Sequence, residues 1–318
     1  MGGITMQQNR TYAIVTPARN EAEYIEHTLR AVTSQTVLPS AWVIVDDGST
    51  DETPDIVMKY AEKFDFIRLE RHSGRDFGTG TDRFSWGVDA VVFNFGLATL
   101  DVDSYDYIVK LDGDLDFDSD YFERIFEEFE NDPRLGIAAG HFYELQDGQW
   151  VLSKVPDWHV RGASKIYRRQ CFRDIRGVEE ILAWDGVDEI RAQLTGWYSR
   201  AFYEPRVKHL RAQGSAAQGT RGGALSGRAR LGLCAYILHY HPLFLVARGV
   251  RLGLGRPRVL GGLAFLYGYL RASIQRPRRL EDDEVVSFLR RSQLQRLIGR
   301  RPYAMSGADV EARSAAEG

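Results

Sequence analysis

Five aspartates alternate with other residues in the stretch DGDLDFDSD, from Asp112 to Asp120, directly behind the apolar run YIVKL. Carboxylates at this density attract a divalent cation. A calcium loop of the EF-hand type would have Glu123 at its twelfth position, but it requires glycine at the sixth, where the chain has Phe117. It also requires an entering helix, whereas YIVKL is typical of a strand. A calcium loop is therefore disfavoured.

A strand before the stretch would place Asp112 and Asp114 on one side, because residues two apart in a strand point the same way. Two carboxylates with open coordination positions suit Mg²⁺ or Mn²⁺, and such an ion could neutralise a diphosphate leaving group. Standing alone, the stretch would also fit a solvated acidic turn. The other aspartates are interpreted as a solvated turn that leads into the helix DYFERIFEEFEN: Asp116, Asp118 and Asp120.

Strands and helices alternate along the first third of the chain. Their patterns predict strands at 12–16, 42–46, 66–70 and 105–111, and helices at 21–35, from about residue 54, and around 84–100. This order predicts an α/β fold with a Rossmann-like, doubly wound and mostly parallel sheet. Ligands of such sheets lie beyond the carboxyl ends of the strands. Polar clusters at 17–21, 46–50 and 112–114 follow predicted strands, so we expect all three at one edge.

Four motifs of this chain resemble those of family 2 glycosyltransferases, which have the GT-A fold. They are TPARNEAEYI (16–25), VIVDDGSTDETPDI (43–56), KLDGDLDF (110–117) and WDGVDEIRA (184–192). The resemblance covers roughly residues 10 to 210, in the family's order and spacing, and the combination of DDGSTD with a later D-x-D is fairly specific. It implies an inverting, metal-dependent enzyme with a nucleotide-diphosphate sugar as donor, a UDP-sugar being favoured.

The resemblance also implies roles for individual residues. The first loop would surround the nucleoside, and Asp47 would meet the base, whereas Asp46 is expected to serve the turn. Asp112 and Asp114 would hold Mg²⁺ or Mn²⁺, with Asp114 the first choice for direct ligation and Asp112 also near the ribose or sugar. For Arg75 an exposed ion pair is the alternative. The predicted nucleotide-sugar contacts are Thr16, Pro17, Ala18, Asn20, Glu21, Asp47, Gly48, Arg75, Asp112 and Gly113.

The last motif resembles the segment that supplies the catalytic base of inverting members. Asp188 is the first candidate and Glu189 the second, and the base would remove the acceptor proton during a single displacement at the anomeric carbon. The alternative is an acid favoured by the dipole at a helix start. Two further segments are expected to contact the acceptor or the phosphates, although an ordinary turn or a structural histidine would fit them as well. Their residues are Gly162, Ala163, Lys165, His209 and Arg211.

Charge is distributed unevenly along the chain. The formal net charge is -3, but residues 206–302 contain nineteen Lys or Arg and four acids, so residues 1–205 carry -16. Apolar blocks between these arginines predict interfacial helices on an anionic membrane. The alternative is a helical subdomain that packs on the acidic catalytic domain or forms a homodimer. Nucleic acid is disfavoured, since the arginines alternate with aliphatic blocks and no reading motif appears.

We expect four segments. They are a flexible amino-terminus at 1–9, a GT-A catalytic domain at 10–210, a basic and largely helical extension at 211–302, and a flexible tail at 303–318. The polar start shows no signal peptide, and the apolar blocks at 231–247 and 259–270 are unconvincing as membrane spans. With Cys171 and Cys234 as the only cysteines, a reducing compartment is the default. The expected location is cytoplasmic, peripheral at the inner face of the membrane.

The leading hypothesis is a glycosyltransferase that transfers sugar to a glycan or lipid-linked acceptor in the synthesis of a surface polysaccharide or glycolipid. A second hypothesis within the same fold is a polyprenyl-phosphate sugar synthase that uses GDP-mannose or UDP-glucose. A hypothesis of another class is a non-catalytic module that binds a nucleotide sugar or calcium. The intact DDGSTD, D-x-D and Asp188 set disfavours this last hypothesis.

Overall fold

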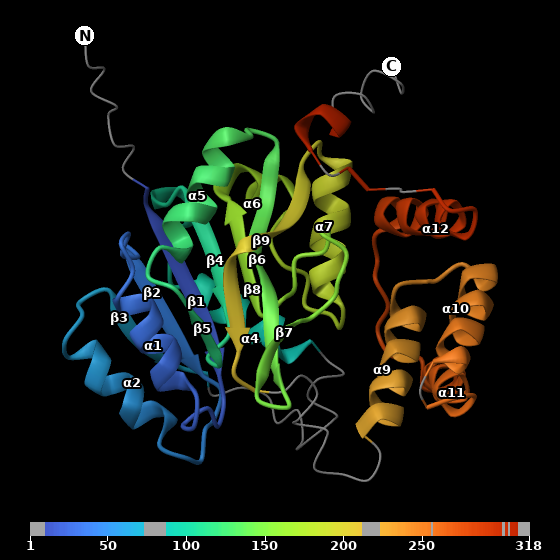
Figure 1. Ribbon diagram of the computed structural model, residues 1–318, viewed down its shortest axis with the longest axis horizontal. Coiled ribbons are helices and arrows are strands. Elements are labelled where there is room, and N and C mark those ends of the chain that lie inside the picture. Colours follow the sequence, from blue (N-terminus) through green and yellow to red (C-terminus); the bar gives the residue numbers. More distant parts are fainter. Residues whose placement is uncertain are drawn as a thin grey trace.

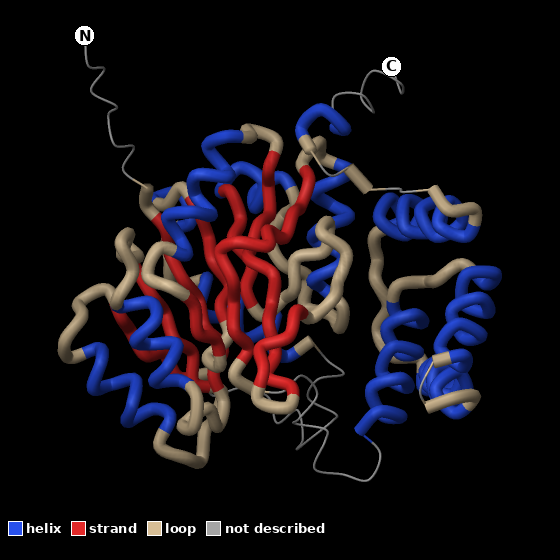
Figure 2. Tube along the Cα trace, in the orientation of Figure 1, coloured by secondary structure: helices blue, strands red, loops and turns tan. Residues whose placement is uncertain are grey.

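A single mixed sheet forms the centre of the molecule (Figure 1). The computed structural model describes residues 10–72, 87–211, 223–255, 257–300, 303–304 and 306–310. Within these residues the sheet has nine strands in the order β3-β2-β1-β4-β8-β6-β9-β5, and β7 pairs with β6 at the side. The strands make one layer in Figure 2, and helices pack on both of its faces. The predicted α/β, GT-A-like fold class is confirmed.

The first half of the sheet is parallel, as the sequence predicts. Its strands are β1 (Tyr12–Ala18), β2 (Ala41–Asp46), β3 (Ile67–Arg71) and β4 (Tyr107–Leu111). β1 pairs in parallel with β2 and β4, and β2 pairs in parallel with β3. β1, β2 and β4 are almost entirely buried, which explains their continuous runs of β-branched and aromatic residues. Their carboxyl ends therefore form one edge, where the predicted polar clusters lie.

The second half of the sheet is mixed, and the sequence reasoning did not resolve it. Its strands are β5 (Leu115–Phe117), β6 (Leu135–Gln146), β7 (Gln149–Leu152), β8 (Ser164–Arg168) and β9 (Tyr198–His209). β8 is antiparallel to β4 and β6, whereas β9 is parallel to β6 and antiparallel to β5. Leu115 pairs with His209, so the end of β9 reaches the DGD stretch from the opposite side.

The β5 strand corrects the interpretation of Asp116 as part of a solvated turn. Asp116 lies in the strand, and its carboxylate accepts a hydrogen bond from Lys208 Nζ at 3.1 Å. Asp118 and Asp120 do precede the predicted helix, which begins at Tyr121. A strand, β4, leads into the stretch where a calcium loop needs a helix, which agrees with rejecting that alternative.

Helices bury their apolar sides on the two faces of the sheet. One core is covered by α1 (Ile25–Thr33), α2 (Thr53–Ala61) and α5 (Tyr121–Asn131). The other is covered by α4 (Val88–Leu97), α6 (Arg169–Asp174) and α7 (Trp184–Leu194), and the short 3₁₀ helix η1 (Val102–Ser104) lies before β4. Because α7 contributes Trp184 and Ala192 to this second core, its first turn is fixed beside β4 and β8.

Within the described residues, the four helices α9 to α12 follow the sheet beside α7 (Figure 1). They are α9 (Gly223–Ile237), α10 (Pro242–Leu254), α11 (Leu260–Gln275) and α12 (Asp283–Leu297). A third core joins Val187 and Ile190 of α7 to residues of α9, α11 and α12. Arg191 adds ion pairs to Glu179 at 2.9 Å and to Asp282 at 3.1 Å. The predicted extension is thus helical, and one side of it packs on the catalytic domain.

The described part of the predicted flexible tail is packed rather than loose. Tyr303 stacks on Trp158 with ring centroids 4.0 Å apart, and the backbone N–H of Ala304 donates to Gln193 at 2.9 Å. Val310 is buried in the core under α5. The prediction failed because Ala-, Ser- and Gly-rich composition does not reveal a few anchoring residues. Residues 1–9 and 311–318 lie outside the described residues.

Candidate functional site

The loops after β1 and β2 are hydrogen-bonded to each other at the predicted edge of the sheet. The backbone N–H of Asn20 donates to Ser49 Oγ at 3.0 Å, and that of Glu21 donates to Thr53 Oγ1 at 2.8 Å. Asn20 Oδ1 accepts from the N–H of Thr50 at 2.8 Å, and Asn20 has a left-handed φ of 53°. These contacts hold the two predicted nucleotide loops as one unit.

The structure places the predicted nucleotide-contacting residues of these loops in different environments. Asp47 is buried, and its carboxylate lies 2.9 Å from His72 Nδ1. Asp46 accepts from the N–H of Ser49 at 2.9 Å, which agrees with its expected turn role. Thr16 is a correction: it is fully buried, and its Oγ1 accepts from Trp42 Nε1 at 2.9 Å, so it supports the sheet and does not face a ligand.

The remaining residues of the predicted donor set line the same edge. Ala18 is buried beneath it, and its carbonyl accepts from the N–H of Asp47 at 2.9 Å, whereas Pro17 is half-buried. Gly48 has a left-handed φ of +76°, which favours glycine. A Cβ on Gly113 would lie 2.9 Å from Ile25 Cδ1, so glycine lets the DGD stretch approach α1. Arg75 lies outside the described residues.

Asp112 and Asp114 lie at the end of β4, in the centre of the edge. The Asp112 carboxylate is paired with the buried Lys110 ammonium, and its side chain is one-third exposed. Burial raises the pKa of Asp112 to about 6 against the opposing charge of Lys110, and the neighbouring Asp114 raises it further. The backbone N–H of Asp112 donates to the Ala163 carbonyl at 2.8 Å, so the predicted 162–163 loop lies beside it.

Asp114 meets the end of β9 and the first loop. Its Oδ2 lies 3.3 Å from His209 Nε2 and 3.5 Å from Arg211 Nε, and Arg211 is also paired with Glu21. Burial raises the pKa of Glu21 to about 8, opposed by Arg211 and reinforced by Asp114. The structure therefore brings together Glu21, Asp114, His209 and Arg211, as the sequence predicts.

The DGD carboxylates fit a divalent cation. Asp114 Oδ1 is buried and has no hydrogen-bond partner among the residues that the structure describes, and a buried carboxylate oxygen is rarely left unpaired. Two carboxylates two residues apart supply the hard oxygen ligands that Mg²⁺ and Mn²⁺ prefer, and these ions complete their shells with water and phosphate oxygens. In the described part of the chain no three His, Cys, Asp or Glu side chains cluster as a complete metal site. Two carboxylates alone would leave coordination positions of such an ion open.

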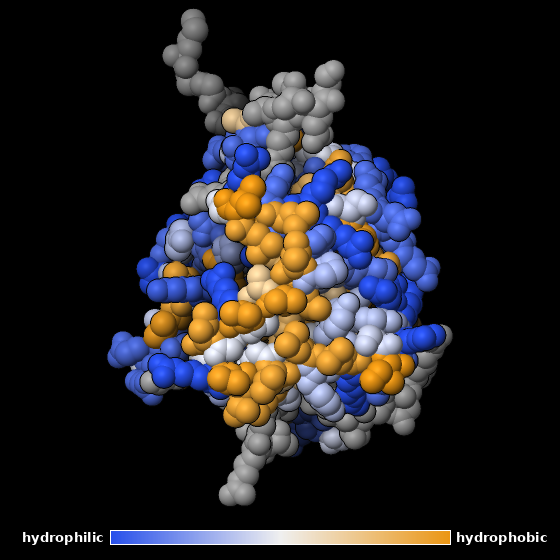
Figure 3. Space-filling view, turned by 90° about the vertical axis from the view of Figure 1, so that its right-hand side faces the viewer, coloured by the Kyte–Doolittle hydropathy of each residue, from blue (hydrophilic) through white to orange (hydrophobic). Residues whose placement is uncertain are grey.

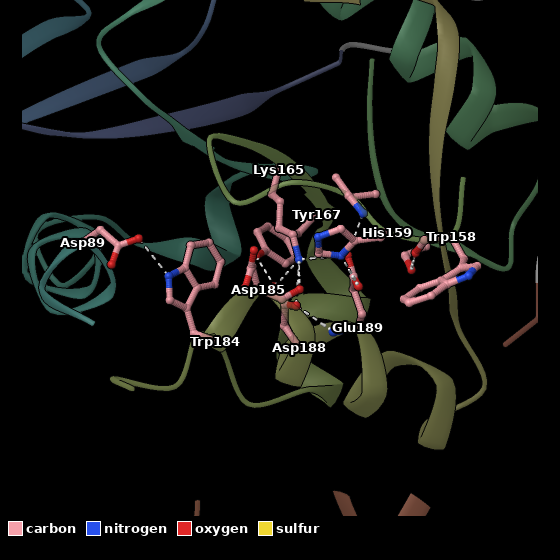
Figure 4. A network of polar contacts seen from close by, with 11 residues as sticks. Asp89, Trp158, His159, Lys165, Tyr167, Trp184, Asp185, Asp188 and Glu189 are labelled. Atoms are coloured by element: carbon pink, nitrogen blue, oxygen red, sulfur yellow. Dashed lines mark hydrogen bonds and ion pairs between the residues drawn. The ribbon is translucent and has the colours of Figure 1, made fainter. Parts of the chain in front are cut away.

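A second acidic cluster lies at the start of α7 (Figure 4). Lys165 Nζ is fully buried and donates to both carboxylate oxygens of Asp188, at 2.8 and 3.0 Å. Tyr167 donates its hydroxyl to Asp188 at 2.6 Å. Burial raises the pKa of Asp188 to about 7 against the opposing charge of Lys165. Asp188 is therefore saturated with internal partners.

Glu189 is engaged in the same way. Its carboxylate accepts from the backbone N–H of Val160 at 2.7 Å, and it lies 3.0 Å from His159 Nδ1 and 3.2 Å from Lys165 Nζ. Only 1% of the Glu189 side chain is exposed. Burial lowers the pKa of His159, but Glu189 outweighs burial and holds that pKa above its usual value. The pair Asp188–Glu189 thus anchors α7 to β8 and to the 158–160 segment.

This burial changes the interpretation of the base candidates. A general base must come within hydrogen-bonding distance of the acceptor hydroxyl. Asp188 and Glu189 are each 1% exposed, so in this structure neither reaches a ligand. Lys165, predicted to assist with phosphate, is likewise fully buried against them. Asp188, Glu189 and Lys165 hold the start of α7 in position, and their side chains do not reach the surface.

Asp185, which the sequence reasoning missed, is less buried than Asp188 and Glu189. It is half-buried in the first turn of α7, and its carboxylate has no hydrogen-bond or ion-pair partner within the described residues. A Cβ on Gly162 would lie 3.3 Å from Asp185 Cβ and 2.9 Å from the Trp184 ring, so the predicted glycine does allow close backbone approach. The Asp112–Ala163 contact continues this chain of neighbours to the DGD stretch.

Trp184 explains why Asp185 is fixed there. Its indole N–H donates to Asp89 of α4 at 2.9 Å, and the ammonium groups of Lys110 and Lys165 lie 5.6 and 5.5 Å from its ring centroid. A signal was available, because Trp184 and Asp185 open the helix, a position at which an acid can face a ligand. Asp188 and Glu189, one turn further along the same helix, were predicted as the base instead.

A Rossmann-like parallel half-sheet followed by a mixed second half is the architecture of the GT-A fold. Residues 13–84 match the family model "Glycosyl transferase family 2". The match supports the resemblance over these residues.

Curated relatives match the amino-terminal half. The chain is 32% identical over 136 residues to poly-beta-1,6-N-acetyl-D-glucosamine synthase of Staphylococcus aureus (strain COL), a match that covers 43% of this chain and 29% of that protein. The synthase of the same name from Staphylococcus epidermidis is 28% identical over 151 residues, covering 47% and 32%. The match thus spans less than one-third of these relatives' length.

A solved structure supports the fold. The mannosyltransferase PcManGT from Pyrobaculum calidifontis, solved with GDP-Man and Mn²⁺, aligns with a TM-score of 0.52 at 17% identity. The alignment covers 96% of this chain and 79% of that one. At this identity the likeness concerns the fold alone.

Proposed function

We propose that this protein is a metal-dependent, inverting glycosyltransferase that moves a sugar from a nucleotide-diphosphate donor to a glycan or lipid-linked acceptor. The observation that carries the proposal is the buried Oδ1 of Asp114, which has no hydrogen-bond partner within the described residues, next to the one-third-exposed Asp112. An orphaned carboxylate oxygen at the carboxyl edge of a parallel sheet is suited to a cation-bound diphosphate.

Asp112 and Asp114 would hold Mg²⁺ or Mn²⁺, which when bound neutralises charge on the departing diphosphate. Arg211 and His209 lie against the same carboxylate and would add positive charge and hydrogen bonds on the phosphate side. Asp47 would accept a hydrogen bond from the base, which is why a UDP-sugar is the first choice.

Asp185 would take the proton from the attacking acceptor hydroxyl. It has the accessibility that Asp188 lacks, and the buried Lys165–Asp188–Glu189 network fixes the helix turn that carries it. Deprotonation at Asp185 while the hydroxyl attacks from the side opposite the diphosphate gives inversion at the anomeric carbon. Asp188 is then a positioning residue.

The acceptor class is proposed from two observations. The curated relatives are named as synthases of a poly-N-acetylglucosamine, which supports a role in surface polysaccharide or glycolipid synthesis. The basic helices α9 to α11 support work on an acceptor at the cytoplasmic face of a membrane, with the protein peripheral to it. No helix within the described residues has the length and apolarity needed for a membrane span.

Release of nucleoside diphosphate from UDP-GlcNAc and from GDP-Man, measured with Mn²⁺ and with EDTA, tests this proposal. We expect release from one donor, dependent on the metal and abolished by Asp114→Asn. The matched control is Asp116→Asn, which removes a partly exposed aspartate two residues further on and should leave the rate unchanged. Equal release by Asp114→Asn and wild type would overturn the proposal.

The same assay separates an enzyme from a non-catalytic binding module. A module would show a metal-dependent thermal shift with the donor but no turnover. Preference for GDP-Man and transfer to a polyprenyl phosphate would favour the polyprenyl-phosphate sugar synthase instead.

A further inference from the structure

An apolar face covers the outer side of α10 and α11, away from the catalytic domain. Ten side chains make up this face, each between 54% and 80% exposed. They recur every three or four residues along each helix, which places them on one side. They are Leu243, Val246, Val250, Leu254, Val259, Leu260, Leu263, Tyr267, Leu270 and Ile274. Figure 3 looks onto this side of the molecule and shows apolar residues gathered across it.

Small residues fill the inner side of the same helices. A Cβ on Gly268 would lie 1.9 Å from the Ala229 carbonyl oxygen, and one on Gly232 would lie 2.0 Å from that of Phe265. Likewise, a Cβ on Gly262 would lie 2.5 Å from the Gly249 carbonyl oxygen. Glycine therefore allows α9, α10 and α11 to pack backbone against backbone, while the large aliphatic side chains point outward. In water, a helical bundle turns its large aliphatic side chains inward. Helices in lipid pack through small residues and turn large aliphatic side chains outward, as these helices do.

The charge around the apolar face is entirely positive. Residues 223–280 contain ten arginines and no Asp or Glu. Arg251, Arg258, Arg271 and Arg276 are exposed, and within the described residues they have no ion-pair or hydrogen-bond partner. Arginines beside an apolar stripe are typical of helices that lie in the interface of an anionic bilayer.

We propose that the outer face of α10 and α11 docks on an anionic lipid surface, with these ten side chains at the acyl boundary and the four arginines at head groups. The proposal rests on the proposed function in one respect: it supplies the surface by which that enzyme would approach a lipid-linked acceptor. A second copy of the chain is the less suitable occupant, because pairing two such faces would bring two positive, acid-free blocks together. Neither helix spans a bilayer, so the contact is shallow.

Sedimentation with vesicles of phosphatidylcholine, with and without phosphatidylglycerol, tests the docking of the full chain. We expect binding only to the anionic vesicles, weakened by high salt. Replacing Leu263, Tyr267 and Ile274 by Ser should lower partitioning on the order of a hundredfold. Replacing Arg251, Arg258, Arg271 and Arg276 by Gln should lower it on the order of a thousandfold, at about one kcal/mol per arginine near the surface.

The matched control is the double variant Leu38→Ser and Met58→Ser, which removes two exposed apolar side chains of the catalytic domain and should leave vesicle binding unchanged. Circular dichroism and thermal unfolding establish that each variant is folded. No binding to anionic vesicles at low salt, or binding that survives both sets of substitutions, overturns the proposal. A dimer that the Leu263, Tyr267 and Ile274 substitutions dissociate overturns it in favour of a second copy.

Donor hydrolysis in the absence of vesicles is measured on the same preparations. Hydrolysis without vesicle binding rejects the docking surface and leaves the proposed function intact. Vesicle binding without hydrolysis rejects the proposed function and leaves the docking surface intact.

Discussion

Two acidic clusters of similar composition lie in this site, and they differ in what neutralises them. Asp188 and Glu189 share the buried Lys165 ammonium and are further hydrogen-bonded by Tyr167 and Val160. Asp112 is paired with Lys110 and Asp114 with His209, but one oxygen of Asp114 is buried without a hydrogen-bond partner among the described residues.

The difference separates structural from functional carboxylates. A carboxylate whose lone pairs are used internally contributes rigidity, and a ligand would have to break those bonds to reach it. A buried carboxylate oxygen without a partner is costly unless something outside the chain completes it. The two clusters are therefore distinguished by how many of their carboxylate oxygens have hydrogen-bond partners within the protein, although their sequences look alike.

The largest expected effect comes from Asp185→Asn. If Asp185 is the base, transfer should fall about a hundredfold to ten-thousandfold, the usual contribution of general base catalysis, in a folded protein. Steady-state transfer with a saturating donor measures it. Asp188→Asn is the matched comparison, and its folded fraction should retain activity within about tenfold. If the two variants exchange these outcomes, Asp188 is the base and its burial here is not maintained during turnover.

Asp114→Asn should reduce transfer by about a thousandfold, or roughly 4 kcal/mol of transition-state stabilisation, because it removes a metal ligand. It should also abolish the Mn²⁺-dependent thermal shift given by the donor. EDTA should reduce the wild-type rate to the same level. An undiminished shift in the variant would contradict the assignment of Asp114 as a ligand.

Lys165→Met should lower the free energy of unfolding by about 3 kcal/mol, because it leaves two buried carboxylates without their cation. Urea unfolding with an unchanged m-value measures this loss. Lys59→Met, at an exposed position of α2, is the control and should stay within about 0.5 kcal/mol of wild type. Equal stability of the two variants would mean that the network is not a structural anchor.

The smallest expected effect is a pH dependence. The folded protein holds protons on His159 and Asp188 more tightly than the unfolded chain does, since both pKa values are raised. The stability from His159 is full below about pH 6.5 and is lost as the pH rises through its folded pKa. Asp188 acts in the same direction, with stability lost as the pH rises from about 4 towards 7.

His159→Gln isolates the histidine part of this effect. The difference in unfolding free energy between wild type and variant should shrink as the pH rises from about 6.5 through the raised pKa of His159. Urea titrations at several pH values measure it. A difference that is constant, or that grows with pH, would show that His159 is not held protonated by Glu189.

The parallel half of the fold could be predicted from the sequence, because β1, β2 and β4 are buried on both faces and appear as continuous apolar runs. The mixed half could not. β9 contains exposed and buried positions in irregular order, and β6 is buried over its first eight residues and exposed at its end. Their pairing has register shifts near Gly140 and depends on contacts between distant segments.

The site was predictable to a similar extent. Asp112, Asp114, His209 and Arg211 do meet, since local motif order and strand ends determine their positions. The burial of Asp188 was not predictable, because it depends on Lys165 and Tyr167 from β8. Sequence spacing places an acid on a helix, but only packing decides whether it faces a ligand or the interior.

The position of α7 has a consequence for the order in which the protein can mature during synthesis. Its first turn carries Asp185, but Val187 and Ile190 are covered by residues of α9 and α12, and Tyr303 completes the same core. These covering residues leave the ribosome after α7. A nascent chain that ends near residue 210 would therefore carry the first turn of α7 on an unsupported helix, and competence should appear only when the residues that cover α7 have folded back onto it.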